Sequence, residues 1–168
     1  MLGGLGSLAA AGLLAGCAGD DGGDGDTPEA GGDSGDDAGA TTGDDGSGAG
    51  YDKGPVDDYL SDVSNYDGAV VDEQGASSVT IAVGTEGNGG NYAYSPAAVV
   101  VDAGTTVQFE WTGQGQQHNV VDEDGAFRSD IYVDSGVHFE YSFDSSGTFR
   151  YFCGPHKSFG MKGVVVVV

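Results

Sequence analysis

At 168 residues the chain has room for one ordinary domain, and its 27 acidic against 5 basic residues give a formal charge of −22. A chain this negative repels phosphate and anionic lipid headgroups, which excludes nucleic acid as a partner and argues against direct binding to an anionic membrane surface. Two cysteines are too few for a disulfide-stapled miniprotein, so the folded part must bury a core or bind something.

The first 17 residues predict a signal peptide. Residues 1–16 are small and apolar, too short to span a bilayer, and they end in Leu14-Ala15-Gly16-Cys17. This ending resembles a lipobox, which implies cleavage before Cys17 and a lipid on its thiol. A non-functional cysteine in a cleaved signal is the alternative. Because no Lys or Arg precedes the apolar run, we expect the natural start to lie upstream.

Residues 18–55 predict a disordered linker rich in Asp and Gly. Residues 18–50 alone hold 10 acids and 12 glycines, with no Lys, Arg or aromatic residue, and such a segment cannot bury a core. If Cys17 is lipidated, these about 33 residues form a tether with a reach on the order of 30 Å. The remaining residues carry 17 acids against 5 bases, which suits a protein that stays hydrated at high salt. An ordinary acidic secreted protein explains the same composition.

Residues 56–168 predict one all-β domain. A short helix is expected over residues 56–65, with Val56, Leu60 and Val63 on one face. Apolar or alternating runs then predict strands at 79–83, 98–101, 107–111, 139–143, 149–153 and 164–168. Glycine-rich turn signals separate these runs, and their spacing predicts an antiparallel β-sandwich.

The candidate metal ligands lie near the end of the domain. Cys153, His156 and Met161 fall within nine residues, and His118 lies 35 residues before Cys153. Two His, one Cys and one Met is the composition of a type 1 copper site, with thiolate and imidazoles in a plane and a weak axial Met. Each residue alone has an ordinary explanation, as core filler or a surface side chain, but the spacing of the set favours a metal site.

His138 serves as the internal comparison. It lies out of phase with Phe139, Tyr141 and Phe143 along one predicted strand, so we expect it to face solvent and not to bind the metal.

The pattern Cys-x2-His-x4-Met, with Gly147–Phe152 before it and His118-Asn119 upstream, resembles the small blue copper proteins of the plastocyanin family. Asp57–Leu60, Asn65–Gly68 and Gly87–Asn91 extend the resemblance to the halocyanins, lipoprotein members of that family in halophilic archaea. The resemblance implies a cupredoxin-like Greek-key β-sandwich that transfers electrons. It also implies one copper ion, held by His118, Cys153, His156 and Met161.

The same resemblance suggests roles for residues around the ligands. Asn119 is expected to tie the His118 strand to the Cys loop, with its N–H near the Cys sulfur, although it could be a simple turn residue. Pro155 lacks an N–H, so Asn119 is expected to be the sole backbone donor to that sulfur. Pro155, Phe159 and Gly160 would form an apolar rim around His156, the expected electron port, unless Phe159 packs in the core.

Three classes of function use copper sites built from these ligands. A multicopper enzyme needs a second copper centre, connected to the first by His residues beside the Cys. Here Phe152 and Gly154 flank Cys153, and the sequence has only one His besides the two candidate ligands. A copper-delivery protein would need exposed, exchangeable ligands. The sequence therefore predicts a non-enzymatic, monomeric electron carrier, lipid-anchored on the extracellular face of the cell membrane, that serves redox proteins of a membrane respiratory chain.

Overall fold

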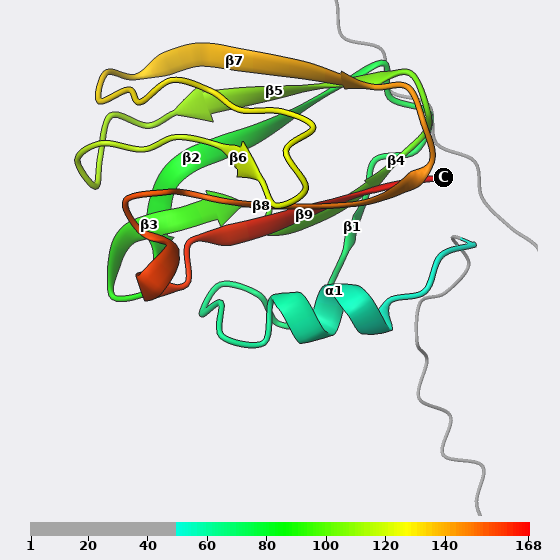
Figure 1. Ribbon diagram of the computed structural model, residues 1–168, viewed down its shortest axis with the longest axis horizontal. Coiled ribbons are helices and arrows are strands. Elements are labelled where there is room, and N and C mark those ends of the chain that lie inside the picture. The colour runs from blue at the N-terminus through cyan, green and yellow to red at the C-terminus, as the bar shows by residue number, and fades with distance from the viewer. Residues whose placement is uncertain (1–49) are drawn as a thin grey trace, which may run out of the picture. The chain divides into compact units, whose positions relative to one another are not determined.

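The computed structural model describes residues 50–168, which form two β-sheets stacked face to face (Figure 1). The predicted signal peptide with Cys17, and the predicted linker as far as residue 49, lie outside the described residues. One sheet contains, in spatial order, β1 (Val71–Asp72), β4 (Ala98–Val101), β9 (Lys162–Val167), β8 (Gly147–Phe152) and β6 (Val121–Asp122). The other contains β3 (Gly90–Ser95), β2 (Ser78–Gly87), β5 (Thr105–Trp111) and β7 (Gly136–Phe143).

The strand pairing is mixed, so the prediction of a purely antiparallel sandwich is wrong. The pairs β1–β4, β4–β9 and β2–β5 run parallel, whereas β2–β3, β5–β7, β6–β8 and β8–β9 run antiparallel. Parallel neighbours need long crossover connections. The chain supplies these connections by passing between the two sheets, and this produces the predicted two-sheet sandwich.

The core explains why β4 and β9 are continuous apolar runs. Val99 and Val165 face the space between the sheets, where Phe109 and Trp111 also pack. Their neighbours Ala98, Val100, Val164 and Val166 face the opposite side and form a second apolar cluster. A strand covered on both faces has no polar side, so its sequence does not alternate.

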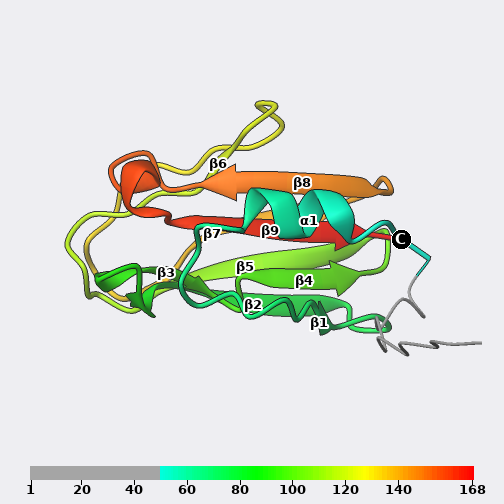
Figure 2. The same cartoon turned by 90° about the horizontal axis from the view of Figure 1, so that it is seen from below.

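The second cluster is covered by the helix α1 (Gly54–Tyr59), which lies across β9 and β8 in Figure 2. The predicted face is confirmed, because Val56, Leu60 and Val63 are all buried there. The predicted helix bounds, residues 56–65, are wrong. The helix starts at Gly54, one residue before Pro55, and ends at Tyr59, and turns then carry Leu60 and Val63 onto the same cluster. Pro fits the first turn of a helix, which explains the early start.

The folded structure also begins earlier than residue 56. Tyr51 packs against the second apolar cluster, and the carboxylate of Asp52 accepts a hydrogen bond from the N–H of Gly54 at 2.9 Å. Within residues 50–168, no helix is both long enough and apolar enough to cross a membrane.

The 3₁₀ helix η1 (Lys157–Phe159) lies in the loop between β8 and β9. Figure 1 shows it at the end of the sandwich opposite the C-terminus. This loop contains three of the four predicted copper ligands, so the fold places the candidate site at that end.

Candidate metal centre

The four predicted ligands come from two segments that meet at one end of the sandwich. Cys153 follows β8 directly, and His156 and Met161 flank η1 in the loop that leads to β9. His118 lies between β5 and β6. Its N–H donates to the carbonyl of Tyr132 at 2.9 Å and its carbonyl accepts the N–H of Tyr132 at 2.9 Å, which fixes the backbone beside the loop.

Three ligand atoms converge closely. The Cys153 Sγ lies 3.7 Å from Nδ1 of His118 and 3.5 Å from Nδ1 of His156, and the two Nδ1 atoms are 3.1 Å apart. Metal bonds of about 2.0–2.3 Å to nitrogen and sulfur separate two ligand atoms by about 3–4 Å. The three donor atoms are therefore already at the spacing that one shared metal ion requires, so the residues fit a copper ion.

The tautomer of His118 supports the same conclusion. Its Nε2 lies 2.8 Å from the carbonyl oxygen of Gln114, which can only accept, so Nε2 carries the proton and Nδ1 presents a lone pair to the cluster. Glycine is required beside this ring. A Cβ on Gly115 would lie 2.7 Å from Nε2, and one on Gly84 would lie 2.9 Å from it.

Burial sets the charge of the ligands. It lowers the pKa of His118, where the Gln114 hydrogen bond opposes the shift and the neighbouring His156 adds to it, and it also lowers the pKa of His156. Both imidazoles are thus kept neutral, the form that binds metal. Burial raises the pKa of the Cys153 thiol because it disfavours the thiolate, so the ligating form requires the positive charge of a metal ion beside it.

The expectation that Asn119 is the sole backbone donor to the Cys153 sulfur stays a prediction. The N–H groups of both Asn119 and His156 act on the thiol to lower its pKa, against the effect of burial. The loop is tight at this point, because the N–H of His156 donates to the carbonyl of Cys153 at 3.1 Å.

Met161 is held in the loop by its backbone. Its carbonyl accepts the N–H of Cys153 at 3.0 Å, its N–H donates to the carbonyl of His156 at 3.2 Å, and its side chain is fully buried. The backbone of Met161, which carries the thioether, is therefore hydrogen-bonded to the backbones of Cys153 and His156.

Asn119 connects the two ligand-bearing segments, as its position predicted. Its Oδ1 accepts the N–H of Gly154 at 2.8 Å, and its own carbonyl accepts the hydroxyl of Tyr94 at 2.6 Å. Both Asn119 and Tyr94 are buried, so these bonds are shielded from water.

The prediction that His138 faces solvent is wrong. The pairing of β5 with β7 skips one residue between Phe139 and Val137, and the resulting irregularity turns the half-buried His138 inward. Its ring stacks on Tyr132 with centroids 4.5 Å apart and packs edge-on against Trp111. It is not among the three residues whose donor atoms converge.

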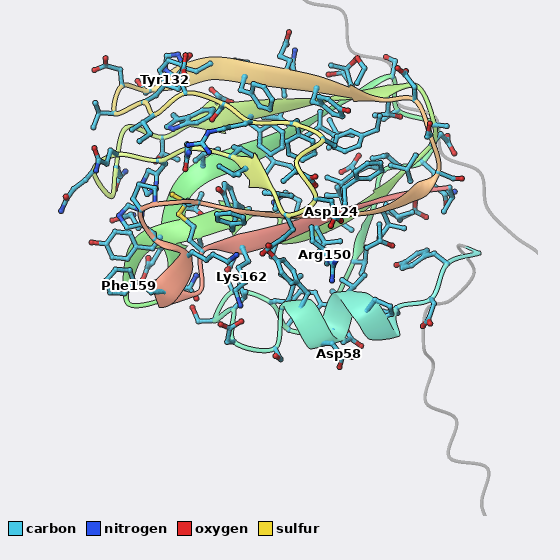
Figure 3. The ribbon with its side chains drawn as sticks, in the orientation of Figure 1. Asp58, Asp124, Tyr132, Arg150, Phe159 and Lys162 are labelled. Carbon is cyan, nitrogen blue, oxygen red and sulfur yellow. The ribbon has the colours of Figure 1, made fainter. Side chains whose placement is uncertain are left out.

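The rim of the site contains a residue that the sequence did not reveal. The ring of Tyr92 in β3 lies 4.4 Å from that of His156 and 5.3 Å from that of Phe159. Phe159 is 56% exposed, so it does not pack in the core, and Figure 3 shows it at the end of the sandwich that carries η1. A tyrosine 64 residues before His156 gives no sequence signal of this contact.

Two imidazoles, one thiolate and one thioether at the end of a β-sandwich define a type 1 copper protein. Copper-binding proteins of the plastocyanin/azurin family match residues 81–168. Halocyanin from Natronomonas pharaonis is 44% identical over 120 residues, covering 68% of this chain and 72% of that protein. Plastocyanin from Ginkgo biloba is 32% identical over 93 residues, covering 48% of this chain and 93% of that protein.

Among solved structures, the oxidized form of plastocyanin from Dryopteris crassirhizoma is 27% identical, with a TM-score of 0.43 over 54% of this chain and 100% of that one. The chain belongs to the plastocyanin/azurin family of copper-binding proteins, which confirms the resemblance seen in its sequence. It has one type 1 copper site, formed by His118, Cys153, His156 and Met161.

Proposed function

We propose that this protein carries single electrons between redox proteins of a membrane respiratory chain, as its copper cycles between Cu(I) and Cu(II). The observation that carries the proposal is the closely spaced and buried donor set of His118, Cys153 and His156, which lies within a hydrogen-bonded loop. Ligands that cannot rearrange serve both oxidation states with little movement, and this is what one-electron transfer requires.

Copper delivery is the alternative, and burial argues against it. His156, the most exposed of the four ligands, is only 7% exposed, and Cys153 and Met161 are fully buried. A delivery protein hands its ion to an acceptor that must reach the ligands. Here an acceptor would first have to open the loop.

The test compares electron transfer with copper loss in the copper-loaded protein. We expect reversible voltammetry, fast electron self-exchange, and no transfer of Cu(I) to a chelator over many redox cycles. Cys153→Ser is the matched control, because oxygen cannot replace the thiolate and the intense blue absorption should disappear. Slow self-exchange together with rapid loss of Cu(I) to the chelator would favour delivery.

The proposal includes a membrane tether through Cys17, placing the domain on the extracellular face of the cell membrane. Its support is the lipobox-like sequence Leu14-Ala15-Gly16-Cys17 together with the acidic, glycine-rich segment that follows. Cys17→Ala should release the protein into the medium or leave it uncleaved. Mass spectrometry that finds an unmodified Cys17 in mature, membrane-bound protein would contradict the tether, and the electron-transfer proposal would still stand.

A further inference from the structure

Asn88 occupies the tight turn between β2 and β3, close to the copper loop. Its φ of 55° lies in the left-handed region, which asparagine adopts more readily than most residues. Its side-chain amide donates to the carbonyls of Tyr92 at 2.7 Å and Gly160 at 2.9 Å. It also forms a reciprocal pair with Ser64: Oδ1 accepts the Ser64 N–H at 2.8 Å, and the Asn88 N–H donates to the Ser64 hydroxyl at 2.6 Å.

These bonds join three segments that are distant in sequence: the hairpin β2–β3, the turn region after α1, and the copper loop. Both N–H groups and the oxygen of the Asn88 amide are used, so the side chain has one defined orientation. A half-buried side chain with all its polar atoms paired acts as a rigid connector.

The contact with Gly160 affects the axial ligand. Gly160 precedes Met161 and has a φ of 91°, and a Cβ at this position would lie 2.9 Å from the carbonyl oxygen of Asp62. Lys162 follows Met161 and forms an ion pair with Asp62 at 2.7 Å. Met161 is therefore flanked on both sides by residues that are bonded to segments outside the copper loop.

The contact with Tyr92 affects a second ligand. Asn88 holds the backbone of Tyr92, and the ring of Tyr92 lies 4.4 Å from the imidazole of His156. One side chain thus supports the neighbours of two ligands, on different sides of the metal.

We propose that Asn88 is a positioning residue of the copper centre. It holds Gly160, and through it Met161, in place, and it holds Tyr92 against His156. Ser64 anchors Asn88, so the segment after α1 takes part in shaping the copper site. The inference needs the copper site but not the electron-carrier role, so its failure would leave the proposed function untouched.

The first variant is Asn88→Gly, because glycine accepts the observed φ and the effects then report the lost side-chain bonds. We expect an altered ratio of the visible absorption bands and an altered copper EPR signal, since both respond to the axial thioether. We also expect release of Cu(I) to a chelator to become about tenfold faster, the scale of one or two hydrogen bonds. In the copper-free protein, the amide protons of Gly160 and Met161 should exchange faster.

A second variant and a control separate positioning from general stability. Asn88→Asp keeps the acceptor for Ser64 but loses both N–H donors, so it should reproduce the spectral change. Tyr66→Phe removes the 2.5 Å bond from the Tyr66 hydroxyl to the Asp57 carboxylate, which joins the segment after α1 to the helix itself and contacts no neighbour of the copper ligands. It should lower the unfolding midpoint and leave the copper spectrum unchanged.

Two outcomes would overturn the proposal. In the first, both Asn88 variants keep the wild-type spectrum and copper release rate. In the second, Tyr66→Phe changes the spectrum as much as they do.

Discussion

The Cys153 sulfur is surrounded by a small number of backbone groups, and these are set by individual residues. The N–H groups of Asn119 and His156 act on it, whereas Pro155, between Cys153 and His156 in the loop, has no N–H to donate. Hydrogen bonds to a ligating thiolate withdraw electron density from the metal and tune its potential. Position 155 therefore controls whether a further donor is present.

Pro155→Ala should raise the reduction potential, provided that the new N–H points at the sulfur. A thiolate that accepts more hydrogen bonds gives less electron density to copper, and it therefore stabilises Cu(II) less. The rise should be tens of millivolts, since about 59 mV is a tenfold shift for a one-electron couple, near the scale of one net hydrogen bond. Voltammetry of both proteins at one pH and salt concentration measures it.

Ser158→Ala is the matched control, because Ser158 lies exposed in the same loop. Its potential should equal that of the wild type. An unchanged or lowered potential in Pro155→Ala, with an intact blue spectrum, would show that Pro155 only tightens the turn.

At the scale of elements, the sequence predicts the strands well where one face is buried. The alternating run at 107–111 lies within β5, whose apolar residues face the core in register. The four ligands were also predictable, because their residue types and spacing are local. Features that depend on tertiary contacts were not: the parallel pairing of β4 with β9, the end of α1, and the β7 irregularity that turns His138 inward.

Leu60→Ala should destabilise the fold by about 3 kcal/mol, because it leaves a cavity between α1 and the sheet. Leu60 is 1% exposed and packs in the second apolar cluster. Asp58→Ala is the control, since Asp58 is an exposed residue of α1, two positions before Leu60, and is directed away from the sheet in Figure 3. Urea unfolding measures both variants, and equal stabilities would show that α1 is not part of the cooperative unit.

Glu123 links α1 to the copper loop. Its carboxylate accepts the Tyr59 hydroxyl at 2.9 Å and pairs with Lys157 of η1 at 2.8 Å. Burial raises its pKa, but the contacts with Lys157 and Tyr59 outweigh this effect and hold the pKa below its usual range. A carboxyl with a lowered folded pKa stabilises the protein above its unfolded pKa, and this contribution is lost as the pH falls through the folded pKa.

Glu123→Gln should therefore cost up to about 1 kcal/mol at neutral pH, and the deficit should shrink as the pH falls through the lowered folded pKa of Glu123. Urea unfolding of both copper-free proteins at several pH values follows the difference. Glu86→Gln, at an exposed position of β2, is the matched control and should keep the wild-type stability at neutral pH. A deficit in Glu123→Gln that stays constant with pH would assign the loss to packing.

On the scale of the whole molecule, charge is unevenly placed over residues 50–168. Three of the five cations gather around Tyr59. Arg150 and Lys162 lie 5.8 and 5.4 Å from the centre of its ring. Lys157 forms an ion pair with Glu123, whose carboxylate accepts a hydrogen bond from the Tyr59 hydroxyl. Figure 3 shows Arg150 and Lys162 on the side of the sandwich that α1 covers. Only two further cations, Lys53 and Arg128, stand in these residues beside their 17 acids.

Ion pairs neutralise only part of this charge. Four pairs join Lys or Arg to acids within residues 50–168, so 13 of the 17 acids there remain outside them. The pairs are at least partly exposed, and such pairs add little stability. Repulsion among the remaining carboxylates therefore opposes folding whenever it is not screened.

The melting temperature of the copper-loaded domain should consequently rise with salt. The Debye length falls from about 30 Å at 0.01 M to about 3 Å at 1 M, so carboxylates across the surface repel one another at low salt and are screened at high salt. Calorimetry at constant copper loading measures the slope. A variant with Asp130, Asp134 and Asp144, all exposed, changed to Asn should melt higher at low salt and depend less on salt. Equal melting temperatures at low and multimolar salt, or an unchanged slope in the triple variant, would show that charge repulsion does not limit stability.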